Sequence, residues 1–192
     1  MATNPSSTTH PTRRPYHGSC HCGKTRYIVY LTLPPTLSAY PPESIAIYKC
    51  NCSTCLKMSY FHTRPIDSPN DFQLLSPLNP TTGGLNDYTC FDKDIHWYFC
   101  GVCGVRCFAV AGEGEVKEVE TEEGKKQVWK VKSEGWDEKK SNYLSVNAAT
   151  IEPGQEGFSL KEWTEKGWIA YGEMREGIDV DRYGEPYEGG MY

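Results

Sequence analysis

Short runs of β-branched and aromatic residues, separated by proline and glycine, dominate the hydrophobic pattern of the chain. Such runs are typical of strands, because branched and aromatic side chains pack well on a pleated surface. The pattern predicts strands over residues 25–31, 44–48, 86–91, 95–99 and 105–110. The third and fourth of these flank Asp92-Lys93-Asp94 and are expected to pair as a hairpin. We therefore predict a mostly β protein.

One segment carries a good helix signature. Ser159 and Glu162 have the spacing of a capping box, and Gly167 can end a helix. These signals predict a short C-terminal helix of about two turns.

Three stretches lie outside this pattern. Residues 1–16 are rich in serine, threonine and proline and are predicted to be a flexible tail. Residues 113–140 hold 9 acidic and 7 basic residues around a few valines, which is typical of a solvated β-hairpin insertion. We expect one domain over residues 17–171 that contains this insertion, followed by an extension over 172–192.

The overall charge excludes some function classes. The chain has 192 residues, with 20 Lys and Arg against 25 Asp and Glu, and a net charge of -5. This balance disfavours a nucleic-acid partner, because affinity for phosphates needs a basic surface. No apolar run approaches the roughly 18 residues of a membrane helix, and no secretory signal is visible. We expect a cytoplasmic protein with no membrane partner.

Nine cysteines are the most informative residues. An odd number without an export signal fits a disulfide framework poorly, so reduced thiols are expected. Seven of them fall into three tight groups, namely Cys20 and Cys22, then Cys50, Cys52 and Cys55, then Cys100 and Cys103. Cysteines separated by one or two residues can grip one metal ion from a single turn. The grouping therefore predicts metal binding.

The first and last groups together supply four thiolates. Zinc takes four such ligands in structural sites, so Cys20 and Cys22 with Cys100 and Cys103 are expected to form a structural tetrathiolate. Its net charge of 2 minus 4, or -2, would make the ion a poor Lewis acid. This zinc is expected to hold distant strands together and not to react.

The middle group has three thiolates and no fourth cysteine nearby in the sequence. Three protein ligands and one open position are typical of a catalytic zinc, and a soft site of this kind suits the thiolate of a substrate. Alternatively, a further residue folds back and closes the site; the candidates are Cys90, Cys107, His17, His21, His62 and His96. For proton transfer near an open site, the candidates are His62 first, then Tyr60 and His21.

The cysteine groups and their neighbours also carry a family resemblance. Gly18-Ser19-Cys20-His21-Cys22-Gly23, Cys50-Asn51-Cys52-Ser53-Thr54-Cys55 and Phe99-Cys100-Gly101-Val102-Cys103-Gly104 resemble the glutathione-dependent formaldehyde-activating enzyme family, also called the CENP-V/GFA domain family. The likeness covers roughly residues 16–111 and continues weakly through 145–152. It implies an Mss4-like fold of antiparallel sheets pinned by zinc, with the same division into a structural and a catalytic zinc.

The resemblance also implies an activity. Members are commonly described as carbon-sulfur lyases, and the namesake reaction joins glutathione to formaldehyde. The expected function is thus a zinc-dependent lyase that makes or breaks a C–S bond between a thiol such as glutathione and an electrophilic carbon. Two alternatives stay open, a non-catalytic zinc-stabilised protein-binding module and a zinc lyase or isomerase of a biosynthetic pathway that needs no thiol. The insertion and the C-terminal extension are not core features of the family, and either could reshape the pocket for a bulkier electrophile.

Overall fold

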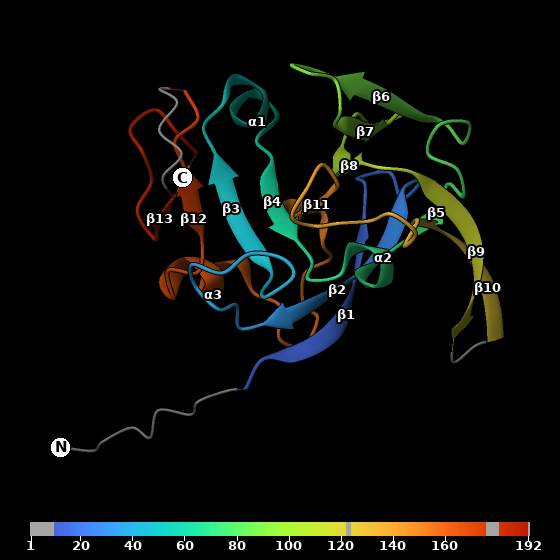
Figure 1. Cartoon of the computed structure of the whole chain (residues 1–192), viewed down its shortest axis with the longest axis horizontal. Coiled ribbons are helices and arrows are strands. Elements are labelled where there is room, and N and C mark those ends of the chain that lie inside the picture. Colours follow the sequence, from blue (N-terminus) through green and yellow to red (C-terminus); the bar gives the residue numbers. More distant parts are fainter. Residues whose placement is uncertain (1–9, 122–123, 176–180, 192) are drawn as a thin grey trace.

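Two β-sheets and a few short helices make up the protein, as seen in a computed structural model that describes residues 10–121, 124–175 and 181–191 (Figure 1). The strands are β1 (Thr12–Ser19), β2 (Arg26–Leu33), β3 (Ala46–Cys50), β4 (Phe61–Arg64), β5 (Phe72–Ser76), β6 (Leu85–Thr89), β7 (His96–Cys100), β8 (Arg106–Ala111), β9 (Gly114–Thr121), β10 (Gly124–Val131), β11 (Tyr143–Asn147), β12 (Ala170–Gly172) and β13 (Asp181–Tyr183). The helices are α1 (Ser53–Met58), α2 (Ser68–Asp71), α3 (Leu160–Glu165) and a 3-10 turn, η1 (Ala148–Thr150). The predicted mostly β fold is confirmed.

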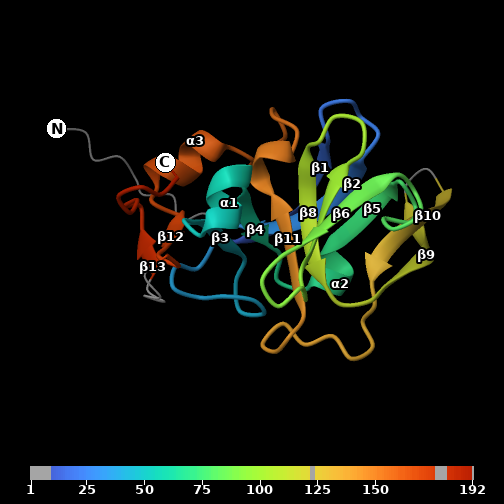
Figure 2. The same cartoon turned by 90° about the horizontal axis from the view of Figure 1, so that it is seen from above.

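The two sheets differ in size. The smaller has the strand order β1-β2-β5-β10-β9, and the larger has the order β13-β12-β3-β4-β11-β8-β7-β6 (Figure 2). Neighbouring strands are antiparallel, with the exception of β12, which runs parallel to β3. The described helices are at most six residues long, so none of them can cross a bilayer, which takes about 20 residues.

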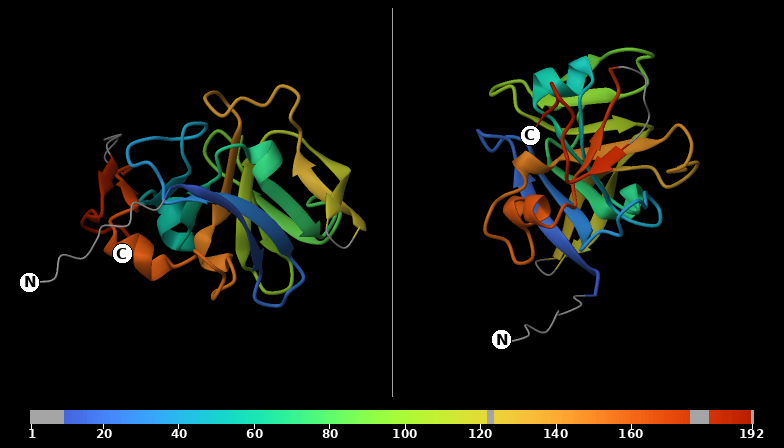
Figure 3. Two further views of the ribbon diagram at one scale, coloured as in Figure 1. Left: turned by 90° about the horizontal axis from the view of Figure 1, so that it is seen from below. Right: turned by 90° about the vertical axis from the view of Figure 1, so that its left-hand side faces the viewer.

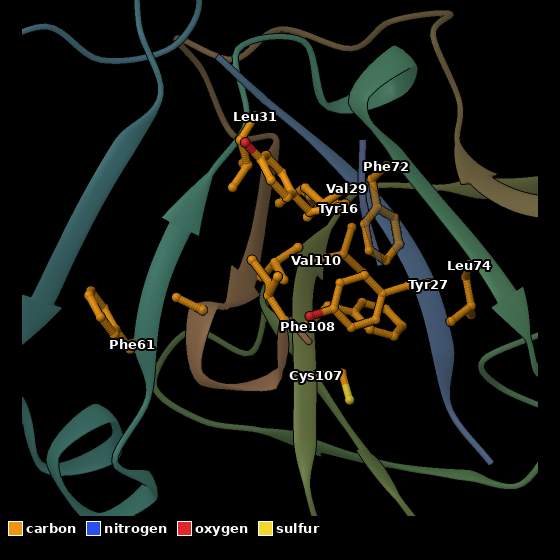
Figure 4. Packing of buried hydrophobic residues seen from close by; sticks show 14 of the residues in the cluster. Tyr16, Tyr27, Val29, Leu31, Phe61, Phe72, Leu74, Cys107, Phe108 and Val110 are labelled. Carbon is orange, nitrogen blue, oxygen red and sulfur yellow. The ribbon is translucent and has the colours of Figure 1, made fainter. Parts of the chain in front are cut away.

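The main hydrophobic core lies between the sheets (Figure 4). Phe72 on β5 contacts Phe108 on β8 with ring centroids 5.2 Å apart, and Tyr27 on β2 packs against Phe72 at 5.8 Å. Trp129 on β10 lies 6.2 Å from Phe108. Aromatic rings from both sheets therefore pack against one another at tilted angles, and burial of apolar surface of this kind is the main favourable contribution to folding.

The larger sheet also has a second, outward apolar face. Because successive side chains of a strand point to opposite sides, Tyr98 and Phe108 join the main core while Trp97 and Ala109 join a separate cluster with Cys50 and Cys55. This alternation places the middle cysteine group on the face that points away from the smaller sheet.

The N-terminal prediction was wrong in part. Residues 1–9 lie outside the described residues, but Thr12 to Tyr16 belong to β1 and pair with β2. Tyr16 is buried, and Arg13 donates to Asp71 through its Nε at 2.8 Å. The polar composition of this segment suggested a flexible tail. The backbone N–H and C=O groups of the segment pair with β2, however, so it forms a strand with few apolar side chains of its own.

The charged insertion and the C-terminal helix both form. β9 and β10 pair along their length, although Trp129 and its neighbours on β10 are buried and extend the smaller sheet beside β5. Residues 122 and 123, between these two strands in the chain, lie outside the described ranges. Helix α3 begins after Ser159, whose Oγ accepts from the Glu162 backbone N–H at 3.1 Å.

Candidate functional site

The four-cysteine cluster joins the turn after β1 to the turn after β7. The sulfurs of Cys20, Cys22, Cys100 and Cys103 all lie within 4.8 Å of one another. Each turn has a backbone hydrogen bond from a glycine N–H to a cysteine carbonyl at 2.9 Å, from Gly23 to Cys20 three residues earlier and from Gly104 to Cys100 four residues earlier. Both glycines have φ of +74°, in the left-handed region that other residues avoid, so the glycines let each turn present two sulfurs to one point.

The geometry of this cluster fits a metal ion. Cys22 Sγ lies 3.6 Å from the sulfurs of Cys20 and Cys100. A tetrahedral ion with bonds of ~2.3 Å to sulfur requires S–S separations of ~3.8 Å. Although burial raises the pKa of the Cys20 thiol, hydrogen bonds from Thr25 and from the thiols of Cys22 and Cys100 outweigh it and lower that pKa to about 6, which favours the thiolate. The cluster could hold a soft divalent ion.

The three-cysteine cluster lies where β3 ends and α1 begins, at the upper ends of β3 and β4 in Figure 1. The sulfurs of Cys50, Cys52 and Cys55 lie within 4.8 Å of one another. Cys52 caps α1, and its sulfur accepts from the Cys55 N–H at 3.4 Å. Hydrogen bonds from the thiols of Cys50 and Cys55 lower the pKa of Cys52 to about 2, so this cluster favours a thiolate before any metal binds.

The structure places none of the candidate fourth ligands on this cluster. Within the described ranges, no other Cys, His, Asp or Glu lies within 4.8 Å of all three sulfurs. Cys107 is buried in the main core, and His96 Nδ1 pairs with Asp87 at 2.6 Å. The remaining candidates lie elsewhere: His17 and His21 are exposed, Cys90 lies 3.5 Å from the Thr54 hydroxyl, and His62 contacts one sulfur of the three.

His62 is tied to the cluster by hydrogen bonds on both ring nitrogens. Its Nε2 lies 3.1 Å from Cys55 Sγ, and its Nδ1 lies 2.9 Å from the Tyr143 hydroxyl and 3.0 Å from the Ser145 hydroxyl. The neighbouring thiols and burial raise the pKa of Cys55, so Cys55 is a thiol until a metal binds. If a metal held Cys55 as a thiolate, the Nε2–H would donate to its sulfur and Nδ1 would accept from a hydroxyl. Burial lowers the pKa of His62 to about 3, so the ring is neutral.

Tyr48 and Tyr143 continue this network. Their hydroxyls are 2.7 Å apart, and the Tyr48 ring stacks on His62 with centroids 4.3 Å apart. Burial raises the pKa of Tyr143 to about 12 and that of Tyr48 well above its usual value. Both phenols therefore keep their protons and can donate hydrogen bonds.

A cavity of about 720 Å³ opens over the three sulfurs and the two phenols. Its walls come from one face of the larger sheet, from the loop between β6 and β7, and from the C-terminal segment. The lining residues are Ser38, Tyr40, Tyr48, Cys50, Cys52, Cys55, His62, Arg64, Cys90, Phe91, Asp92, Ile95, Trp97, Tyr143, Gly172, Met174, Asp181 and Tyr183.

The three residues proposed for proton transfer have different positions. His62 lines the cavity. Tyr60 is fully buried behind it and donates to the Ser145 carbonyl at 2.8 Å. His21 stands between Cys20 and Cys22 in the sequence, at the other cysteine cluster, and is exposed. Sequence reasoning missed Tyr48 and Tyr143.

The C-terminal extension, and not the charged hairpin, shapes the cavity. Met174, Asp181 and Tyr183 belong to the extension and line the cavity, whereas no residue of β9 or β10 does. The hairpin extends from the opposite end of the molecule (Figure 3). Of these two stretches, the extension is the one whose described residues line the cavity.

Comparisons with known proteins do not assign a function to this site. No protein-family model matches the chain, and no curated protein matches it. A crystal structure of a Rhodobacter sphaeroides protein aligns over 76% of this chain and 93% of its own, with 16% identity and a TM-score of 0.41. At that level of similarity the alignment supports no statement about function.

Proposed function

We propose that the protein is a cytoplasmic, zinc-dependent carbon-sulfur lyase, similar to the glutathione-dependent formaldehyde-activating enzymes, that joins a thiol such as glutathione to an electrophilic carbon or reverses that reaction. One observation carries the proposal. Three converging cysteine sulfurs line a large cavity, and no fourth protein ligand among the described residues completes the group. Three protein ligands beside a cavity are the arrangement of catalytic zinc sites, whereas structural sites take all four ligands from the protein.

Both clusters suit zinc by their chemistry. Their donors are thiols alone, which favour soft divalent ions, so Cys20, Cys22, Cys100 and Cys103 would hold the structural ion and Cys50, Cys52 and Cys55 the catalytic one. At the three-thiolate site, zinc would lower the pKa of a thiol substrate and so supply a thiolate at neutral pH. With zinc bound, the His62 Nε2–H would donate to Cys55 Sγ and so orient that ligand.

The phenol groups of Tyr48 and Tyr143 would carry out the proton transfer. In the forward direction, the substrate sulfur forms a bond to a carbonyl carbon, and the C=O π electrons move to oxygen. Tyr143 donates a hydrogen bond and then a proton to this oxygen, and the proton lost by the substrate thiol restores the phenol. The hydroxyl of Tyr48 lies 2.7 Å from that of Tyr143, also lines the cavity and would be a second donor. The product is a hemithioacetal, with every atom of both substrates retained.

Cys52→Ala tests this function. The variant should lose one of two bound zinc ions and all formation of the C–S bond from glutathione and formaldehyde, while its circular dichroism spectrum stays that of the wild type. Cys107→Ala is the matched control, because Cys107 is a core thiol outside both clusters. Its variant should keep both ions and its activity.

Three results would contradict the proposal. Undiminished turnover by Cys52→Ala would show that the three-cysteine cluster is not needed for C–S bond formation. Turnover of a carbonyl compound that does not need a thiol would indicate the thiol-independent lyase or isomerase. A wild-type protein that holds two zinc ions and forms no C–S bond would indicate a zinc-stabilised binding module.

A further inference from the structure

The large cavity is far bigger than a one-carbon electrophile needs. Pockets of about 300–1,000 Å³ hold ligands of drug size, and this one measures about 720 Å³. The extra space is bounded by ordered side chains, among them Trp97, which is 5% exposed and whose indole meets the ring of Tyr60 edge-on at 5.1 Å. A formaldehyde molecule has two heavy atoms and would leave most of this surface uncovered.

The walls are aromatic. Six of the lining residues carry aromatic phenyl, phenol or indole rings, namely Tyr40, Tyr48, Phe91, Trp97, Tyr143 and Tyr183. Phe91 and Met174, which are 72% and 53% exposed, add two further apolar side chains to this lining. These walls would stack on flat rings, which gain more from such contacts than aliphatic chains do.

The charges around the cavity oppose an anion. Arg64 is its one lining cation among the described residues, and its guanidinium already pairs with Glu138 at 3.3 Å. Two carboxylates, Asp92 and Asp181, also line the cavity. The three-thiolate site adds negative charge even with a divalent ion bound. A ligand with a carboxylate or sulfonate would therefore meet like charge and no free cation.

A separate groove reaches the same sulfurs. It measures about 500 Å³ and is lined by Cys50, Cys52, Ser53, Phe91, Met174 and Arg175. Phe91 and Met174 line both spaces and stand between them. An anionic thiol can approach the sulfurs on the Arg175 side, which leaves the aromatic cavity for the second substrate.

From these observations we propose that the large cavity binds a multi-ring aromatic compound without negative charge, and that this compound is the electrophilic substrate. The role as electrophile rests on the proposed function, whereas the binding does not. Phe91 and Met174 are the residues expected to set specificity at the mouth, and Asp181 the residue that excludes anions.

Two dyes with the same rings test the binding. N-phenyl-1-naphthylamine is uncharged, and 8-anilino-1-naphthalenesulfonate adds one sulfonate. In fluorescence titrations of the zinc-loaded protein, the uncharged dye should bind at least about tenfold more tightly. Phe91→Ala should weaken its binding about tenfold. Tyr88→Ala is the matched control, since Tyr88 is an exposed aromatic residue of the same hairpin outside the cavity lining, and it should leave binding unchanged.

The remaining variants separate this inference from the proposed function. Asp181→Asn should reduce the difference in affinity between the uncharged dye and the sulfonated dye. Cys52→Ala should abolish C–S bond formation and still bind the dye, because the aromatic walls stay in place. Equal binding of the two dyes, or equal effects of Phe91→Ala and Tyr88→Ala, would overturn the inference, even if glutathione and formaldehyde react. Dye binding without any C–S chemistry would overturn the function alone.

Discussion

Replacing Cys100 with alanine should show how much the four-cysteine cluster contributes to stability. A metal held by all four thiols links turns whose ligands are 78 positions apart in the chain. For a cross-link that closes a loop of this length, chain entropy predicts about 4.5 kcal/mol. That is a large share of the 5–15 kcal/mol that holds a typical domain together. With an unfolding entropy of about 2.1 cal/mol/K per residue over 192 residues, the loss corresponds to a fall in Tm of about 11 °C.

Calorimetry with and without a zinc chelator measures this effect. The Tm of the zinc-loaded wild type should fall on chelation by at least that amount. The Tm of Cys100→Ala should already be low before chelation, and it should fall less when the chelator is added. Cys90→Ala, which removes a half-buried thiol outside both clusters, should behave like the wild type. If Cys100→Ala melts within about 2 °C of the wild type, the cluster does not act as a cross-link and the reasoning fails.

Three further substitutions give contrasting expectations. Tyr143→Phe should lower kcat about 100-fold while the protein keeps two zinc ions. Tyr60→Phe, which changes a phenol outside the cavity lining, should leave kcat unchanged, and equal kcat values for the two variants would exclude Tyr143 as the donor. Gly18→Ala should destabilise by about 1–3 kcal/mol in urea denaturation, because its Cβ would lie 2.1 Å from Tyr27 Cζ; an unchanged midpoint would contradict this packing. Tyr16→Phe should stabilise by about 1 kcal/mol in the same assay, because the buried Tyr16 hydroxyl has no hydrogen-bond partner among the described residues, and a loss of stability would reveal one.

The cysteine clusters could be anticipated because their spacing is a local property. Two cysteines one to three positions apart share a turn whatever the rest of the fold does, so Cys50, Cys52 and Cys55 were expected to act together, and the structure groups their sulfurs within 4.8 Å. Strands were likewise visible as β-branched and aromatic runs. The short helix α3 was visible through its capping residues, Ser159 and Glu162.

The neighbours of the site could not be anticipated, because they depend on sheet order. Tyr143 reaches His62 because β11 pairs with β4, and Met174 reaches the cavity because β12 runs parallel to β3. Neither pairing follows from local sequence, since long-range strand order is set by packing of whole faces. A usable signal did exist. Tyr48 precedes Cys50 by two positions in one strand, which puts both side chains on the same face.

The closeness of the sulfurs has a practical consequence for anyone who handles the protein. When a metal is bound, each thiolate of the four-cysteine cluster is a metal ligand. Once a chelator removes the metal, the sulfur of Cys22 lies 3.6 Å from the sulfurs of Cys20 and Cys100 with no ion between them. Cys22 is also exposed to solvent. An oxidant would then join pairs of them as disulfides, with S–S bonds of ~2.05 Å that no longer bind zinc. After demetallation in air, added zinc alone would therefore not restore the site, and the apo form should be prepared under a reductant.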